Sequence, residues 1–160
     1  MILPIDKPAG MTSHDVVNRI RKAYGLKKVG HAGTLDPFAT GVLIILIGRQ
    51  STKKSQEYMG QAKQYLATMK LGFISDTHDR DGQIQPHMSQ VIPSRDMIQD
   101  SLEQYQGDIE QIPPMHSAIK IGGKKLYHLA RKGQTIDRPP RHVTIHDIQC
   151  VRYQYPFLTL

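Results

Sequence analysis

The sequence predicts a mixed α+β fold, in which a mainly antiparallel sheet is flanked by helices. Apolar residues recur at helical spacing in two segments, 13–24 and 94–106. Shorter segments are either continuously apolar or alternate between apolar and polar residues, as strands do, and glycine and proline separate them. Helices interspersed with such strands are typical of the α+β class. The length of 160 residues suits one compact domain, or one domain with a short appendage.

The first third of the chain predicts a strand, a helix, a loop and a second strand. Residues 2–5 form the short first strand. Ser13 is the expected N-cap of a helix that ends at Gly25, because apolar side chains follow it at helical spacing. Residues 29–41 are rich in glycine and predict a loop. The apolar run 42–47 then predicts a buried strand.

The middle of the chain alternates between short predicted elements and polar loops. Residues 51–59 predict a short polar helix. Residues 63–71 predict a half-buried strand, because the alternate residues Tyr65, Ala67, Met69 and Leu71 would share one face. Residues 75–87 predict a long polar loop. Ser94 is the expected N-cap of a second helix that Gly107 closes.

Extended structure dominates the prediction for the last third. Residues 117–127 predict a hairpin around Gly122 and Gly123. Residues 143–151 and 157–160 read as extended. The last segment stops in mid-pattern, without a turn, cap or charged tail. It is therefore expected to lack a neighbouring strand, which predicts a fold truncated at the C-terminus.

Composition excludes several classes of protein. The longest apolar run has six residues, about a third of a membrane-spanning helix, so no membrane protein is expected. Asp6 and Lys7 interrupt the N-terminus before a signal peptide could develop, which predicts a cytoplasmic location. The one cysteine, Cys150, excludes an intramolecular disulfide framework and a multi-cysteine zinc site.

Positive charge is concentrated in two segments. Residues 1–56 carry nine Lys and Arg against three acidic residues, and residues 117–141 carry seven against one. Residues 57–116 between them carry four against nine. This distribution is typical of a polyanion-binding protein, with nucleic acid as the favoured partner, although basic runs can also be simple solvated surfaces.

Two motif-like segments lack the residues that their chemistry requires. Residues 25–30 have the glycine spacing of a Walker loop, but His31 and Ala32 occupy the positions of its lysine and hydroxyl residue. Asp76, Asp79 and Asp81 precede Gly82, yet they do not supply a full calcium ligand set, so a solvated loop is the better interpretation.

The candidate catalytic segment is residues 30–41, which read Gly-His-Ala-Gly-Thr-Leu-Asp-Pro-Phe-Ala-Thr-Gly. Asp36 lies between a glycine-rich approach and Pro37, which has a fixed φ. Such a loop presents one carboxylate rigidly and allows a ligand to come close to the backbone. An Asp-Pro pair alone would indicate only a turn, but the whole string is far more specific.

Residues 30–41 resemble the catalytic motif of the TruB family of bacterial tRNA pseudouridine synthases. Residues 6–13 are similar to the Lys-Pro-x-Gly motif of that family, and residues 63–82 to its aromatic strand and the loop that follows. Residues 112–133 resemble its RNA-gripping insertion. Because these motifs occur in family order along the chain, coincidence is very improbable.

The resemblance implies the pseudouridine synthase fold for residues 1–160, as an incomplete catalytic domain with the RNA-gripping insertion at about 112–141. Family members continue into a Gly-Thr-Tyr-x-Arg motif, whose arginine pairs with the catalytic aspartate. Most bacterial members then carry a C-terminal RNA-binding domain. Neither is found in this sequence.

The implied activity is isomerisation of uridine to pseudouridine in the T-loop of tRNA, with Asp36 as the essential carboxylate. Asp36 either adds covalently to the sugar or base, or removes the C2′ proton to give a glycal. The resemblance implies no cofactor and no metal. It implies the tRNA T-arm as the partner, no obligatory protein partner, and a monomer.

Further site residues follow from the same resemblance. Tyr65 would stack on the target base, although a core tyrosine is the alternative for an alternating strand. His31 would take the space of the flipped-out nucleotide, the alternative being a structural turn residue. Lys7 is also assigned to substrate binding. The predicted RNA backbone contacts are Lys120, Lys124, Lys125, Arg131, Lys132 and Arg141.

Two other functions remain open at this point. The chain could be a catalytically silent RNA-binding fragment with the same fold and basic segments. It could also belong to a family member that acts on another RNA, since related synthases modify other RNAs with protein or guide-RNA partners.

Overall fold

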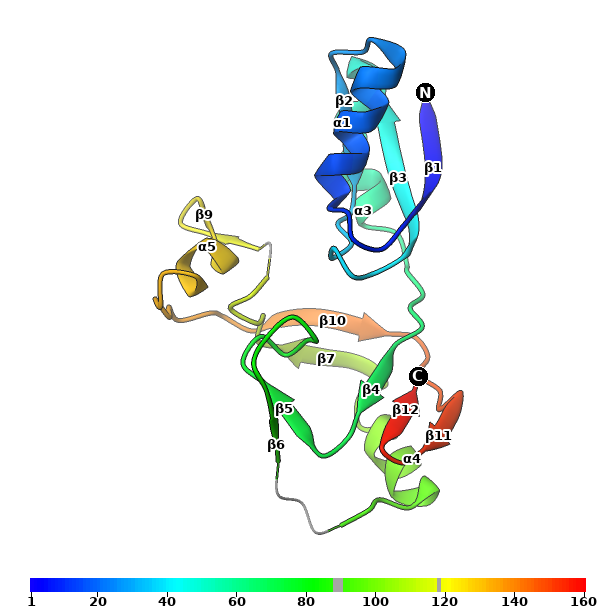
Figure 1. Cartoon of the computed structure of the whole chain (residues 1–160), viewed down its shortest axis with the longest axis vertical. Helices are drawn as coiled ribbons and strands as arrows, with labels where there is room; N and C mark the ends of the chain where they lie inside the picture. Colours follow the sequence, from blue (N-terminus) through cyan, green and yellow to red (C-terminus); the bar gives the residue numbers. More distant parts are fainter. Residues whose placement is uncertain (88–90, 118) are drawn as a thin grey trace. The chain divides into compact units, whose positions relative to one another are not determined.

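The computed structural model describes residues 1–87, 91–117 and 119–160, and the chain forms two compact units, Met1–Gln64 and Tyr65–Leu160 (Figure 1). Each strand pairing in the described residues is antiparallel, and helices accompany the sheets in both units. The predicted α+β class is confirmed. Within the described part of the chain, no helix is long and apolar enough to cross a membrane.

The first unit is built on a three-stranded sheet with the order β1-β3-β2. The predicted strands are confirmed as β1 (Ile2–Lys7) and β3 (Gly41–Ile47). The prediction of an uninterrupted loop over residues 29–41 is wrong, because β2 (Val29–Ala32) pairs with β3. Gly30 of β2 has an extended backbone. It is compatible with a strand that is held in place by its pairing with the apolar strand β3.

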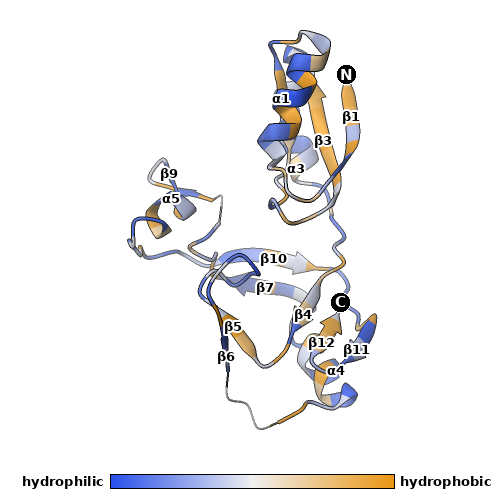
Figure 2. Ribbon diagram, in the orientation of Figure 1, coloured by the Kyte–Doolittle hydropathy of each residue, from blue (hydrophilic) through white to orange (hydrophobic). Residues whose placement is uncertain are grey.

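Helix α1 (Ser13–Tyr24) covers this sheet. Val16 and Val17 pack in one buried cluster with side chains of β2 and β3, and the apolar colouring of β1 and β3 marks the same core (Figure 2). The cluster consists of Val16, Val17, Val29, Leu43, Ile45 and Ile47. Burying each such side chain contributes about 1.5–3 kcal/mol, so this cluster stabilises the packing of α1 on the sheet.

The N-cap of α1 is Thr12, so the prediction of Ser13 is wrong by one residue. The Thr12 hydroxyl accepts a hydrogen bond from the Asp15 amide at 3.1 Å, and the Asp15 carboxylate accepts one from the Thr12 amide at 2.9 Å. This reciprocal capping box satisfies two amides that the helix leaves unpaired. The predicted stop is confirmed, since Gly25 caps the helix in the left-handed conformation, with φ of 63°.

Two short helices, α2 (Arg49–Lys53) and α3 (Ser55–Met59), follow β3. They replace the single helix predicted over residues 51–59. Lys54 is both the C-cap of α2 and the N-cap of α3, so the two helices meet at this residue.

The second unit contains a sheet with the order β11-β12-β4, formed by β11 (Arg152–Gln154), β12 (Phe157–Thr159) and β4 (Thr68–Lys70). Helix α4 (Arg95–Glu103) packs on it, and its predicted N-cap is confirmed, because the Ser94 hydroxyl accepts from the Met97 amide at 3.2 Å. The expectation that residues 157–160 lack a neighbouring strand is wrong. Strand β12 is the central strand and is paired along both edges.

The predicted half-buried strand over residues 63–71 is mostly wrong. Only β4 is a strand, and all residues of the segment except Leu71 are exposed. The apolar alternation is real, but a strand becomes half-buried only where another element covers it.

The polar loop predicted over residues 75–87 is shorter than expected. Strands β5 (Phe73–Ser75) and β6 (Ile84–Pro86) flank it as a hairpin. The Asp76 carboxylate accepts from the Gln83 amide at 2.7 Å. The Asp79 carboxylate accepts from the Thr77 hydroxyl at 2.6 Å. These acidic groups therefore hold the loop together, as the solvated-loop interpretation requires.

Strands β7 (Gly107–Gln111) and β10 (Arg141–Ile145) form a separate antiparallel pair. Strand β7 was not predicted. The extended segment expected over residues 143–151 is wrong beyond Ile145, because residues 146–151 are irregular.

The predicted hairpin within residues 117–127 is confirmed as β8 (Lys120–Ile121) and β9 (Lys124–Lys125). Gly122 and Gly123 make the turn with φ of 56° and 79°, the pair of positive values that a two-residue hairpin turn needs. Helix α5 (Leu126–Ala130), which was not predicted, follows directly.

Candidate active site and RNA-contact residues

The Asp36 loop, residues 33–40, connects β2 to β3 at one end of the first sheet. Lys7 lies opposite Gly41 in the β1–β3 register, so the turn that follows β1 lies at the same end. Asp36 is exposed to solvent. The Ala39 amide donates to the Asp36 carbonyl at 3.0 Å, which closes a turn around the carboxylate-bearing residue. Asp36 is thus an exposed residue within a closed turn.

Ser13 holds the residue that precedes Asp36. Its hydroxyl donates to the Leu35 carbonyl at 3.1 Å and accepts from the Leu35 amide at 3.0 Å. Ser13 is buried at the start of α1, and Leu35 packs against the core cluster. One side chain therefore satisfies both backbone groups of Leu35 and fixes the loop to the helix.

Lys7 and Gly10 hold the residue that follows Asp36. The Gly10 amide donates to the Pro37 carbonyl at 2.8 Å. The Lys7 ammonium contacts the same carbonyl at 3.4 Å and donates to the carbonyls of Pro8 and Met11 at 2.9 and 2.8 Å. Asp36 is thereby held through its neighbours on both sides.

The exposed fraction of Lys7 is 0%. Burying an ammonium group is unfavourable unless its donors find acceptors, and the three donors of Lys7 meet three carbonyls. The structure thus places Lys7 inside the protein, beneath the loop. Its assignment to substrate contact stays a prediction, and its observed contacts are those of a residue that positions the Asp36 loop.

His31 is on β2, opposite Ile45, and is partly buried. Its Nδ1 contacts the carbonyl oxygen of Gly33. Because a carbonyl oxygen only accepts, Nδ1 is the donor of this hydrogen bond. The bond ties the ring to the start of the Asp36 loop.

Tyr65 is the first residue of the second unit, and 67% of it is exposed. Tyr65 therefore lies outside the buried clusters of the described residues. Its stacking on a base stays a prediction.

The basic hairpin β8–β9 brings like charges together. Lys120 and Lys125 are opposite each other in the register. Like charges directly opposite are destabilising in a sheet unless an anion joins them. Leu126 and Leu129 are buried and anchor α5, which continues from the hairpin.

The ring of Tyr127 lies close to two cations, Lys125 and Arg131. The Lys125 ammonium and the Arg131 guanidinium lie 5.4 and 5.5 Å from the centre of its ring, within the range of cation–π contact. The rings of Tyr127 and His128 have centroids 4.2 Å apart. The predicted RNA-contact residues on this element therefore have an aromatic support.

Two predicted RNA-contact residues that are distant in sequence line the same groove. Lys120 and Arg141 border a hollow of about 420 Å³. Its other lining residues are Pro113, Ile119, Ile121 and Pro139. Lys124 and Lys132 are exposed on the hairpin and after α5. In the described residues, no group of three or more histidine, cysteine, aspartate or glutamate side chains could hold a metal ion.

Sequence reasoning missed the role of Ser13 at the Asp36 loop. Its assignment as a helix cap concealed this role, because a serine at a helix start is usually interpreted as a cap. Ser13 and its hydrogen-bond partner Leu35 are 22 positions apart, so no local pattern could link them.

Comparison with solved structures first defines the class of fold. The chain superposes on one chain of the structure described as a Cbf5–Nop10–Gar1 complex, with a TM-score of 0.70 and 27% sequence identity. The match covers 99% of this chain and 37% of the other. A chain of an H/ACA RNP bound to a substrate RNA containing 2′-deoxyuridine gives a TM-score of 0.63 at 25% identity, covering 99% and 35%. The fold is the pseudouridine synthase fold.

Comparison of sequences then gives the family. Residues 21–160 match the family model described as TruB family pseudouridylate synthase (N terminal domain), and the chain belongs to this family. Over 157 residues it is 46% identical to the tRNA pseudouridine synthase B of Protochlamydia amoebophila (strain UWE25) and 46% identical to that of Chlamydia pneumoniae. These matches cover 98% of this chain but 59% and 66% of the relatives, so the chain spans about three-fifths of their length.

Proposed function

We propose that the protein isomerises uridine to pseudouridine in tRNA, at the uridine of the T-loop, with Asp36 as the essential carboxylate. The observation that carries the proposal is an exposed aspartate whose two neighbours are both fixed, within a chain of the TruB family. The names of the relatives, tRNA pseudouridine synthase B, support tRNA as the substrate.

The chemistry requires one well-placed carboxylate. The N-glycosidic bond breaks, the base rotates, and a new bond forms through C5, so product and substrate contain the same atoms. No oxidant, reductant or group donor enters the balance. Asp36 either adds covalently to the sugar or base or removes the C2′ proton. Both routes need the carboxylate at a fixed position, because misplacement by about 1 Å can cost a factor of 100 in rate.

The other site residues are proposed to handle the extruded nucleotide. Flipping a base from its stack costs roughly a few kcal/mol. His31 would occupy the vacated space, and its ring is already tied to Gly33. Tyr65 would stack on the uracil ring, and its exposure supports this role. The predicted cations of the β8–β9 hairpin, of the segment that follows α5 and of β10 would contact phosphates.

The test is pseudouridine formation in a T-arm stem-loop transcript, with purified protein alone and its Asp36→Asn variant. Full-length tRNA pseudouridine synthase B of Chlamydia pneumoniae is the positive control. We expect the variant to lose activity by a factor on the order of 10⁴, because a group that acts on the reacting atoms is removed. The thermal midpoint of the variant is measured in parallel, so that a loss of activity caused by unfolding is distinguished from the loss of a reacting group.

A chain that binds the transcript but forms no pseudouridine, while the control does, would favour a silent RNA-binding role. Equal activity of the two proteins would remove Asp36 from the mechanism. Activity on other RNAs but not on the T-arm would contradict the substrate assignment alone.

A further inference from the structure

The three-stranded sheet of the second unit has two faces of different character. Residues opposite each other in an antiparallel sheet point to the same face, and so do residues two apart on one strand. Leu158 is buried against Ile98 and Leu102 of α4, so Leu158 and its partners Tyr153 and Met69 belong to the covered face.

The register assigns six other residues to the opposite face. Gln154, Phe157 and Lys70 form one row across the strands, and Arg152, Thr159 and Thr68 form the next. We call these six residues the open face. Five of them are exposed and Thr159 is partly exposed.

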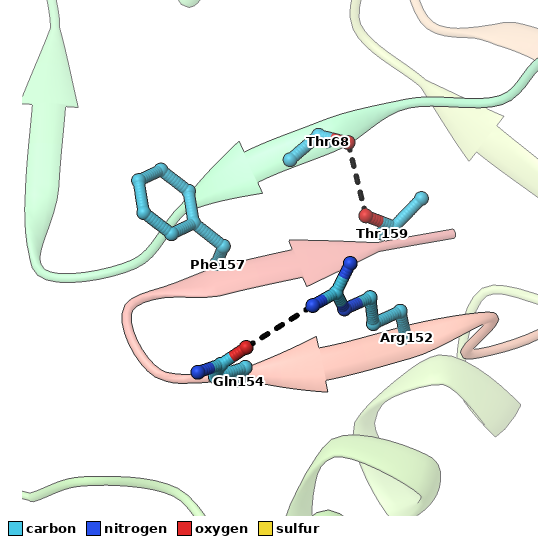
Figure 3. Close-up of a pocket in the computed structure, with 5 residues that line it drawn as sticks. All are labelled: Thr68, Arg152, Gln154, Phe157 and Thr159. Atoms are coloured by element: carbon cyan, nitrogen blue, oxygen red, sulfur yellow. Dashed lines mark hydrogen bonds between the residues drawn. The ribbon is translucent and has the colours of Figure 1, made fainter.

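The open face combines an aromatic ring with cations and neutral polar groups. Phe157, which is 52% exposed, projects from the central strand. Arg152 and Lys70 provide positive charge, and no acidic residue is among the six. Figure 3 shows five of these side chains around a hollow of about 300 Å³, which is at the lower end of the range of small-ligand sites. Its lining residues are Thr68, Arg152, Gln154, Phe157 and Thr159.

Hydrogen bonds preorganise the polar groups of this hollow. Arg152 Nη2 donates to Gln154 Oε1 at 3.2 Å, which leaves the amide NH₂ of Gln154 as a donor and further N–H groups on the guanidinium (Figure 3). The hydroxyls of Thr68 and Thr159 are hydrogen-bonded to each other at 2.9 Å. The Lys70 ammonium lies 3.9 Å from the centre of the Phe73 ring.

This chemistry fits an unpaired nucleotide better than a covering protein segment. An exposed aromatic ring on an open sheet supports a base by stacking, and adjacent cations contact its phosphates. An apolar protein segment that covered this face would bury Arg152 and Lys70. None of the six residues is a carboxylate that could pair with them, so this burial would be unfavourable. The cations and the aromatic ring are complementary to RNA.

We propose that the open face binds a single-stranded segment of the RNA, with one base stacked on Phe157 and phosphates at Arg152 and Lys70. The inference rests on the proposed function, in that the protein acts on RNA. It adds a contact surface that involves neither the Asp36 loop nor the basic residues of the β8–β9 hairpin.

The test compares two substitutions on the open face with two matched controls. Phe157→Leu removes the stacking ring but keeps an apolar side chain, and Tyr105→Leu does the same at another exposed aromatic residue. Arg152→Gln removes one cation of the open face, and Arg95→Gln removes an exposed cation on α4. The dissociation constant for the T-arm stem-loop is measured at several salt concentrations, together with the thermal midpoint.

We expect Phe157→Leu to weaken binding about 5-fold or more. Arg152→Gln should weaken binding and reduce the slope of log K against log salt by about 0.7–0.9. The controls should leave the dissociation constant and the slope unchanged. All four variants should keep the thermal midpoint of the parent chain within a few degrees.

Binding by both open-face variants that matches the controls would overturn the proposal. So would weaker binding that accompanies a comparable loss of thermal midpoint, because the residues would then act through the fold. Pseudouridine is measured in the same samples. Pseudouridine formation by the parent chain, with no effect of either open-face variant on binding, refutes this inference alone. If the parent chain forms no pseudouridine while its binding still depends on Phe157, the proposed function alone is refuted.

Discussion

The Asp36 loop and the basic hairpin β8–β9 differ in how their side chains are held and in the charge that they carry. The loop is fixed by hydrogen bonds from Ser13, Gly10 and Lys7 to the backbone on both sides of one carboxylate. The hairpin instead opposes Lys120 to Lys125 and continues into α5, whose Leu126 and Leu129 are buried. Position is the property built into the first region, and charge is the property built into the second.

This difference predicts how each region responds to substitution. A loop that positions a reacting group should lose activity when a supporting contact is removed, even when RNA binding is retained. A hairpin that supplies charge should lose affinity when cations are removed, with the rate at saturating RNA retained.

Among the substitutions that compare the supports of the two regions, the largest effect is expected from Lys7→Met. Three carbonyls lose their buried donor, which should reduce the free energy of unfolding by about 3 kcal/mol. Denaturant unfolding measures this value, and Lys22→Met on the exposed side of α1 is the control. The rate at saturating RNA should fall under conditions in which the variant is still folded. A folded variant with the parent rate would show that the Asp36 loop needs no support from Lys7.

A smaller effect is expected from neutralising the hairpin and α5 region with the triple substitution Lys124→Gln, Lys125→Gln and Lys132→Gln. If each lysine contacts one phosphate, the slope of log K against log salt should flatten by about 2–3. The rate at saturating RNA should stay within about 2-fold of the parent rate. A slope equal to that of the parent chain would contradict the assignment of these lysines to the RNA backbone.

The smallest effect concerns the cap that orients α1, and therefore Ser13. Hydrogen bonds from the Thr12 hydroxyl and then the Thr12 amide lower the pKa of Asp15 below its usual value. A carboxyl with a lower pKa in the folded state stabilises the fold above its unfolded pKa, and this contribution is lost as the pH falls through the folded value. The stability difference between the parent chain and Asp15→Asn should therefore be greatest near neutral pH and shrink below about pH 4.

Thermal unfolding of both proteins between pH 7 and pH 2 measures this difference. Asp96→Asn in the first turn of α4 is the comparison, since Ser94 caps that helix without a reciprocal carboxylate bond. A difference that is constant with pH would show that the capping box is not coupled to the charge of Asp15.

The sequence predicted elements best where the signal is local. Gly25, Ser94 and the Gly122–Gly123 turn are all positions at which one residue type satisfies a backbone requirement, and each is confirmed. Predictions that depended on a covering or pairing element were less accurate. The half-buried strand over residues 63–71 shrank to β4, and the loop over residues 29–41 gained β2.

The candidate site was also predictable in part. The string around Asp36 identified the family, because twelve consecutive residues carry much more information than any one of them. The same string places Pro37 directly after Asp36 and His31 five positions before it in the chain. It carries no information about the residues that support the loop from elsewhere.

By itself, the sequence determined the α+β class, the helix caps at Gly25 and Ser94, the hairpin turn and the membership of Asp36 in a specific motif. These follow from periodicity, backbone preference and motif identity, which act over a few residues. Only the tertiary structure decided that Lys7 is buried among carbonyls, that Ser13 holds Leu35 and that β12 is central. Those contacts join residues from different elements, and their existence depends on strand pairing and packing that local patterns do not encode.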